Sequence, residues 1–182
     1  MVSPCVLALL IVTAALSRVA HADARAESAE VGAVSVLDAQ RTGQGVAIGY
    51  ENGAFGRGFG QGLRLKIPFN QHWGTRIRVL SVVGTDSAAD EFQFDMGGRL
   101  ELYGESRVLM NLVRLYGGGG VQLFDQVSGP QRGEVSWGGG GQFGFEFFLS
   151  PKTAFFIEVG GNDGGARLTG ATVMAGVGWY PK

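Results

Sequence analysis

The residues that decide the fold are 59–69, which read FGQGLRLKIPF. From Leu63 to Phe69 every second residue is apolar, and Arg64 and Lys66 occupy positions between them. Successive side chains of a β-strand point to opposite faces, so this spacing predicts a strand with one apolar face and one charged face. A helix would repeat its apolar positions every three to four residues, and these residues do not.

The same alternation continues along most of the chain. Apolar residues stand at every second position, and charged residues, glutamines and glycines stand between them. The predicted strands are 45–50, 59–69, 76–83, 92–102, 113–123, 137–147, 155–159 and 171–179. The chain holds 32 glycines, each of which would cost a helix about 1 kcal/mol relative to alanine. The pattern therefore predicts an all-β fold with eight antiparallel strands.

Two runs of glycine interrupt this pattern, Gly117 to Gly120 and Gly138 to Gly141. A flexible linker is the alternative interpretation of such runs. The alternation resumes in phase after each of them, however, so we predict that both lie inside strands. Glycine there would permit the sharp curvature and close packing of a narrow barrel.

The first 44 residues differ from the rest of the chain. Residues 6–16 form an apolar run, and Ala20-His21-Ala22 matches the small-residue pattern of a signal-peptide cleavage site. The run is shorter than the about 20 residues that a membrane-spanning helix needs. We expect a signal peptide over 1–22, a periplasmic lead-in over 23–44 and a barrel over 45–182. Whether Val31 to Leu37 forms an extra strand is left open.

The composition excludes several classes of protein. The formal net charge is −1, which gives no support for binding to nucleic acid. The only cysteine, Cys5, lies within the expected signal peptide, so the mature chain would have no disulfide or cysteine-based site. Only three of the 15 basic residues are lysines, few for a soluble surface of this size.

The lengths of the connections favour a membrane barrel over a soluble one. Short connections are expected at 70–72, 104–107 and 149–153, and longer, more polar ones at 51–58, 84–90, 125–133 and 162–168. Short periplasmic turns opposite longer external loops are typical of outer-membrane barrels. An even number of strands places both termini of the barrel chain on the periplasmic side.

One face of the strands carries charges of both signs. In a membrane barrel this face lines the interior, where an eight-stranded barrel is just wide enough to be filled by side chains. Arginine suits such a place because its planar group pairs with carboxylates. The expected interior ion-pair network is Arg64, Lys66, Arg76, Arg78, Asp95, Arg99, Glu101, Arg114, Glu146 and Glu158. The alternative is a charged outer face in water.

Aromatic residues gather near the predicted short turns and at the end of the last strand. Amphipathic rings at such positions are typical of the girdles found where a barrel meets the membrane surface. The expected girdle residues are Phe69, Trp73, Tyr103, Phe147, Phe155, Trp179 and Tyr180. Ordinary core aromatics are the alternative.

Two stretches carry a resemblance to a known group of proteins. Leu65 to Gly74 (LKIPFNQHWG) resembles a strand–turn–strand junction of the small outer-membrane β-barrel proteins, and Ala175 to Tyr180 (AGVGWY) resembles their terminal strand. This group includes the transmembrane domain of outer-membrane protein A and the X-type eight-stranded barrels. The resemblance implies an eight-stranded antiparallel up-and-down transmembrane β-barrel, a Gram-negative outer-membrane location and assembly by the barrel-assembly machinery.

The residues offer little for catalysis. His72 is the only histidine after the expected signal peptide, and no serine stands beside it. Glu146 and Glu158 lie on neighbouring predicted strands, where paired carboxylates can act as acid and base, but ion pairs with Arg99 or Arg114 are the simpler interpretation. We therefore expect a protein that is not an enzyme and has no cofactor or metal site.

Three functions fit these features. The first is an envelope-structural or surface-interaction barrel with a plugged interior, monomeric and in contact with outer-membrane lipid and lipopolysaccharide. The second is a narrow or gated pore. The third is a soluble, periplasmic, lipocalin-like barrel that binds a ligand, which would need the opposite orientation of the strand faces.

Overall fold

The computed structural model describes residues 45–86, 91–110, 112–129, 131–163 and 168–181. The expected signal peptide, the lead-in over 23–44 and the open question of a strand over Val31 to Leu37 lie outside these residues. Within the described part of the chain, no helix is long and apolar enough to cross a membrane.

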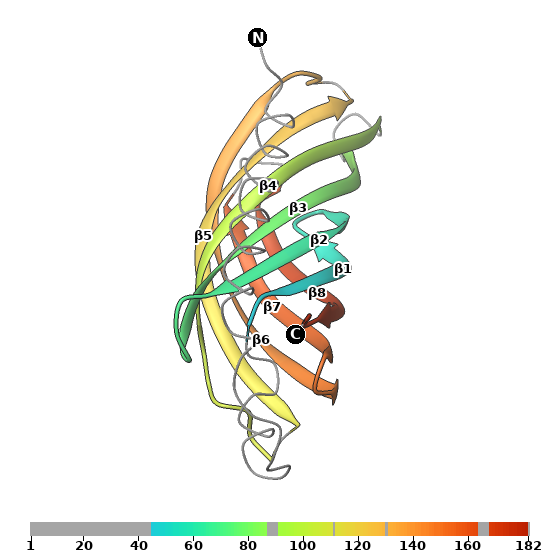
Figure 1. The fold of residues 1–182 in the computed structure, drawn as a ribbon. Helices are drawn as coiled ribbons and strands as arrows, with labels where there is room; N and C mark the ends of the chain where they lie inside the picture. The colour runs from blue at the N-terminus through green and yellow to red at the C-terminus, as the bar shows by residue number, and fades with distance from the viewer. Residues whose placement is uncertain (1–44, 87–90, 111, 130, 164–167, 182) are drawn as a thin grey trace.

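Eight antiparallel strands form a closed barrel in which each strand pairs with its neighbours in sequence and β1 pairs with β8 (Figure 1). The strands are β1 (Ala47–Phe55), β2 (Gly58–Pro68), β3 (Trp73–Asp86), β4 (Glu91–Glu105), β5 (Val113–Ser128), β6 (Val135–Ser150), β7 (Thr153–Asp163) and β8 (Gly170–Trp179). The predicted all-β, eight-stranded, antiparallel up-and-down barrel is therefore confirmed.

Two of the connections between strands differ in length from the predicted alternation of short and long connections. β1 and β2 are joined by Gly56 and Arg57 alone, where a loop over 51–58 was expected. Gly56 has a φ of 59°, which glycine adopts readily and which suits the first position of a two-residue hairpin turn. At the other end of the barrel, seven residues from Ser106 to Leu112 separate β4 from β5, more than the four expected.

The two glycine runs lie within β5 and β6, as predicted, and they lie opposite each other. Gly119 pairs with Gly141, and Gly120 pairs with Gly140. A Cβ at the inward-facing Gly120 would collide with the carbonyl oxygen of Leu100 on β4. These glycines therefore let the backbones of neighbouring strands and the interior side chains approach closely.

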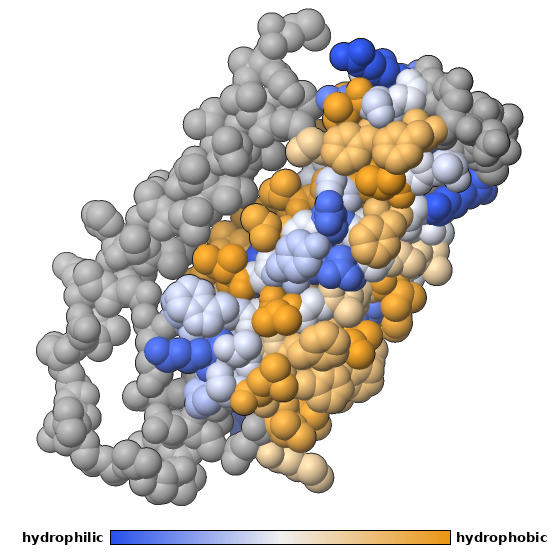
Figure 2. Space-filling view, turned by 90° about the vertical axis from the view of Figure 1, so that its right-hand side faces the viewer, coloured by the Kyte–Doolittle hydropathy of each residue, from blue (hydrophilic) through white to orange (hydrophobic). Residues whose placement is uncertain are grey.

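The charged face of each strand points into the barrel, and the apolar face forms its exterior. Arg64, Arg78 and Glu158 are at most 3% exposed, whereas Leu63 and Val159 are about half exposed. Figure 2 shows hydrophobic side chains over much of one side of the exterior, with a small hydrophilic patch among them. The Tyr50 hydroxyl on this exterior donates a hydrogen bond to Gln61 Oε1. The soluble alternative required charges outside, so the orientation contradicts it.

Five of the seven expected girdle residues lie on the exterior of the barrel. Phe69, Trp73 and Trp179 are exposed near one end of the barrel. This is the end at which β1 begins and β8 ends, and it is called the terminal end hereafter. Phe147 and Phe155 are half-buried on the exterior.

Tyr103 and Tyr180 lie inside the barrel, 1% and 2% exposed, so their assignment to the girdle is wrong. Tyr103 follows Glu101 by two residues and therefore shares its inward face. Tyr180 follows Trp179 on the opposite face of the last strand. Proximity to a predicted turn suggested the girdle, but strand phase decided which way each ring points.

Candidate functional site

The strand register brings basic residues together on one wall of the barrel interior. Arg64 pairs with Arg78 between β2 and β3, and Lys66 pairs with Arg76. Acidic residues stand across the interior on β6 and β7, as Glu146 and Glu158. The ion pairs between these two walls therefore cross the lumen and join residues at least 80 positions apart in sequence.

The first group of ion pairs lies toward the terminal end and consists of Lys66, Glu105, Arg114 and Glu146. Lys66 Nζ lies 2.5 Å from Glu105 Oε2 and 3.5 Å from Glu146 Oε2. Arg114 Nη1 lies 3.4 Å from a carboxylate oxygen of each of the same two residues. The Tyr180 hydroxyl donates a 2.6 Å hydrogen bond to Glu146 Oε1.

The second group lies in the middle of the barrel and consists of Glu51, Arg76, Arg78, Arg99, Glu101 and Glu158. Glu101 receives Arg76 Nε at 2.6 Å and Arg99 Nε at 2.6 Å. Glu158 accepts hydrogen bonds from Arg76 Nη1 at 2.5 Å and from Arg78 Nη2. Tyr116 also donates to Glu158, at 2.8 Å.

Arg64 connects the two groups. Its Nη1 donates to Glu158 Oε1 at 3.0 Å, and its Nη2 donates to Glu146 Oε1 at 3.3 Å. The guanidinium carbon stands 3.2 Å from the centre of the Phe156 ring, a cation–π contact that holds the planar group in place. A planar fork with separate donors can serve two carboxylates at once, which a lysine ammonium does less well.

Small residues provide the space for this network. A Cβ at Gly49 would stand 3.0 Å from the Arg64 side chain, and a Cβ at Gly140 would stand 2.9 Å from Arg99 Nη2. Both glycines therefore allow a guanidinium to lie directly against the strand. Their positions explain why an eight-stranded barrel can enclose so many long side chains.

Apolar clusters close the interior on both sides of the charged layer. At the end opposite the terminal end, hereafter the loop end, the buried cluster is Phe55, Leu80, Val82, Phe124, Leu168 and Met174. At the terminal end it is Ala47, Phe148, Ala154 and Tyr180, with Val108 packed against it. An apolar cluster therefore lies between the ion pairs and each end of the barrel.

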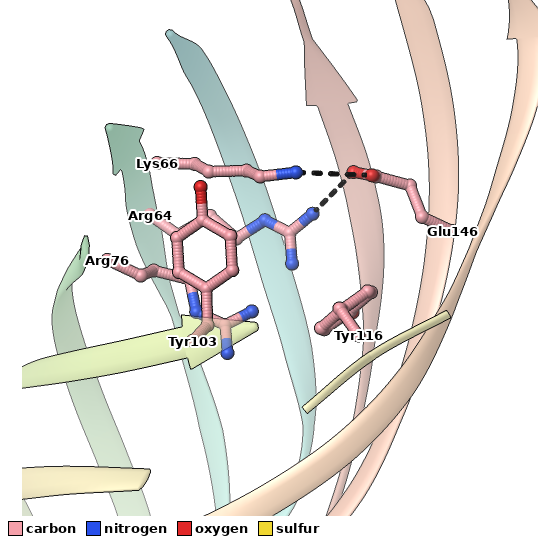
Figure 3. Close-up of a pocket in the computed structure, with 6 residues that line it drawn as sticks. All are labelled: Arg64, Lys66, Arg76, Tyr103, Tyr116 and Glu146. Carbon is pink, nitrogen blue, oxygen red and sulfur yellow. Dashed lines mark hydrogen bonds and ion pairs between the residues drawn. The ribbon is translucent and has the colours of Figure 1, made fainter. Parts of the chain in front are cut away.

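A small cavity remains inside the charged layer. Its volume is about 10 Å³, room for one water-sized particle. It is lined by Arg64, Lys66, Arg76, Tyr103, Tyr116 and Glu146, and Figure 3 shows the basic side chains reaching toward Glu146 from the opposite wall. Around this cavity the interior is filled by side chains.

Every residue of the predicted interior network is buried. Nine of the ten are brought together by the ion pairs described above. Asp95 lies nearer the loop end, where the Gln93 side chain donates a 3.2 Å hydrogen bond to it.

Two members of the network were missed by the sequence analysis, Glu51 and Glu105. Glu51 is completely buried and lies 3.5 Å from Arg78 Nη1, but it fell within the expected first loop. The available signal was the alternation of the strand. Glu51 lies two residues after Gly49 and therefore on the same, inward face. Glu105 was assigned to a turn, although it also continues the inward face of Glu101.

The residues considered for catalysis have ordinary surroundings. His72 is exposed, and its Nδ1 lies 3.2 Å from the carbonyl oxygen of Glu105. Glu146 and Glu158 are both surrounded by basic groups, and Glu146 pairs with Arg114 as expected. Glu158 pairs with Arg64, Arg76 and Arg78 and not with Arg99 or Arg114. Among the described residues, no group of three or more His, Cys, Asp or Glu side chains is arranged to hold a metal ion.

No protein-family model and no curated protein matches the sequence. Solved structures do match the fold. The outer membrane protein OprG from Pseudomonas aeruginosa is 14% identical, with a TM-score of 0.53, over 74% of this chain and 95% of that chain. Neisserial surface protein A (NspA) is 11% identical, with a TM-score of 0.52, over 75% and 94%. The N-terminal β-barrel domain of Pseudomonas aeruginosa OprF is 11% identical, with a TM-score of 0.51, over 74% and 95%. The predicted resemblance to small outer-membrane barrels is confirmed at the level of the fold.

Proposed function

We propose that this protein is a monomeric outer-membrane barrel of the Gram-negative cell envelope, closed to solutes, with a structural or surface-interaction role. The observation that carries the proposal is the enclosed layer of paired charges with an apolar cluster on each side of it. An interior of this kind fills the lumen and blocks it.

The apolar exterior supports the location in a membrane. Leu63, Val79, Leu100, Val121 and Val159 are exposed on five different strands. Such a continuous apolar surface is unusual for a protein in water and suits the lipid chains of a bilayer. Export by the expected signal peptide over 1–22, insertion by the barrel-assembly machinery, and contact with lipid and lipopolysaccharide follow from this location.

The filled interior supports a closed barrel over a pore. Conduction would require several of the ion pairs to break and both apolar clusters to open, and each broken pair leaves a charge without its partner in a poorly solvated place. The surroundings of His72, Glu146 and Glu158 likewise favour a role without catalysis. The role of the barrel is then carried by its exterior and its connections.

Two experiments test the proposal. Cells that express the full chain are fractionated, and we expect the protein in the outer membrane and a heat-modifiable mobility on gels. Recovery in the soluble periplasm without detergent would refute the location.

The purified protein is then reconstituted in planar lipid bilayers. We expect no conductance steps from protein whose folding is verified by gel mobility. Reproducible steps from folded protein would overturn the closed barrel and favour the gated pore. A porin reconstituted in the same way controls for successful insertion.

A further inference from the structure

The connection between β4 and β5 presents apolar side chains at the terminal end of the barrel. Leu109 and Leu112 are each about half exposed, and Met110 is 97% exposed. Leu149, close to the end of β6, is 71% exposed and lies next to the connection, since the Phe148 amide donates a 2.8 Å hydrogen bond to the Leu112 carbonyl oxygen. Leu109, Met110, Leu112 and Leu149 are hereafter the tip patch. Apolar side chains gathered on a surface usually mark contact with another molecule or with a membrane.

The backbone holds the tip patch in a tight turn. The Leu112 amide donates a 3.0 Å hydrogen bond to the Leu109 carbonyl oxygen, and Leu109 and Val113 exchange two further hydrogen bonds. Met110, within this turn, has a φ of 52°, a left-handed conformation that suits glycine or asparagine and is unfavourable for methionine. Val108, just before the turn, packs against the apolar cluster of the terminal end. The turn therefore holds a large apolar side chain outward in a strained conformation, which points to a partner outside the barrel.

Basic side chains flank the tip patch. Arg107 precedes it by two residues, and Lys152 follows it by three. Both side chains are exposed, and neither forms an ion pair with another described residue. Among the described residues, the terminal end exposes no carboxylate, because that of Glu105 is held inside the barrel by Lys66. The surroundings of the patch therefore carry positive charge, which suits a partner with negative charge.

The position and size of the tip patch favour a lipid partner over a protein. Phe69, Trp73 and Trp179 are exposed at the same end, where such rings mark the level of the membrane surface. The patch also continues into the lipid-facing exterior, because Val113 and Phe147 pair directly beside it. A stable protein interface usually takes about 20–30 residues on each side, far more than four side chains. A membrane surface, in contrast, takes up small groups of apolar side chains.

We propose that the tip patch is a membrane anchor that binds acidic phospholipid at the terminal end of the barrel. Met110 and the three leucines enter the boundary between headgroups and acyl chains, and Arg107 and Lys152 pair with headgroups of net negative charge. The inference rests on the membrane location in the proposed function, and it adds a binding segment and a lipid class. Insertion is verified separately by heat-modifiable gel mobility, so a failure of the anchor is distinguishable from a failure of the location.

A polarity-sensitive fluorophore on a single cysteine tests the depth of the patch. Met110→Cys is made in a full chain that also carries Cys5→Ser, and the labelled protein is refolded in vesicles of phosphatidylcholine and phosphatidylglycerol. The references are Leu63→Cys on the lipid-facing exterior and Gln131→Cys on an exposed connection at the loop end. We expect emission from position 110 at a shorter wavelength than from position 131. Equal emission from these two positions in an inserted barrel would overturn the anchor and favour a protein partner.

Paired charge variants test the lipid class. The urea midpoint of unfolding is compared in vesicles of phosphatidylcholine alone and in vesicles that also contain phosphatidylglycerol. We expect phosphatidylglycerol to raise the midpoint of the parent protein, because a lipid that binds the folded state stabilises it. Arg107→Gln with Lys152→Gln should lose most of this rise, whereas Arg57→Gln with Arg132→Gln, the matched pair of exposed residues at the loop end, should keep it. A rise of equal size in both double variants, or no rise in the parent protein, would overturn the assignment.

Discussion

The charged middle of the barrel and the apolar clusters at its two ends fill the same narrow lumen in different ways. In the middle, each acidic side chain of the network has basic partners, and Glu158 alone meets Arg64, Arg76 and Arg78 across the lumen. At the loop end, Phe55 and Phe124 pack with ring centres 5.6 Å apart and need only a good fit of shape. Both arrangements exclude water.

The difference indicates that the ion pairs and the apolar clusters contribute differently to the stability of the closed barrel. A buried ion pair contributes little net stability over an apolar packing of the same volume, but loss of one partner is severe. We therefore expect the middle layer to contribute specificity of strand register, and the end clusters to contribute net stability. Substitutions in each region test this difference, and their effect is measured as the change in free energy of unfolding in lipid vesicles by urea titration.

The largest effect is expected in the middle layer. Glu158→Ala leaves three buried guanidinium groups without a shared partner and should lower the free energy of unfolding by about 3–5 kcal/mol. Glu134→Ala, on an exposed loop residue, is the control and should change it by less than about 0.5 kcal/mol. A loss below 1 kcal/mol at Glu158 would mean that the layer is solvated.

The loop-end cluster should respond less strongly. Phe124→Ala removes a ring that is 1% exposed and should lower the free energy of unfolding by about 3 kcal/mol through the cavity it leaves. The barrel should remain closed in planar bilayers, because the charged layer still fills the lumen. Conductance by folded Phe124→Ala would show that the end cluster alone is the barrier.

The glycines behind the charged layer test how tightly it is packed. A Cβ at Gly120 would stand 2.6 Å from the Cα of Glu101, so Gly120→Ala should cost about 2 kcal/mol of unfolding free energy. At Gly141, on the outer face of the paired strand, the nearest atom to a new Cβ is 3.4 Å away. Gly141→Ala should therefore be nearly neutral, and equal effects would contradict an interior packed more tightly than the exterior.

The smallest effect is expected where the two kinds of filling meet. Tyr180 packs its ring in the terminal-end cluster and donates its hydroxyl to Glu146. Tyr180→Phe keeps the ring and should lower the free energy of unfolding by about 1.5 kcal/mol, as expected for a lost hydrogen bond to a charged group. If Tyr180→Phe has the same free energy of unfolding as the parent protein, then the ring, and not the hydroxyl, accounts for the contribution of this residue to stability.

Much of the fold was predictable because successive side chains of a strand point to opposite faces, so apolar and polar residues alternate along the sequence. Arg64 and Lys66, placed between Leu63 and Ile67, marked an inward face that the structure confirms as buried. The errors occurred where the predicted strands end too early. Glu51, in the middle of β1, lies just beyond the predicted strand over 45–50, and Tyr103, within β4, lies just beyond the predicted strand over 92–102. Neither residue was therefore oriented by the alternation that oriented its neighbours.

The eight antiparallel strands, and the side chains that share a face, could be read from the order of the residues, since both follow from local backbone geometry. The pairing of each acid with its base could not. Those partners are brought together by the closure of the sheet and by the register of each strand against the next, so that Arg64 reaches Glu146 and Glu158 across the lumen. Contacts between residues so distant in sequence depend on the curvature of the whole barrel, which no single strand encodes.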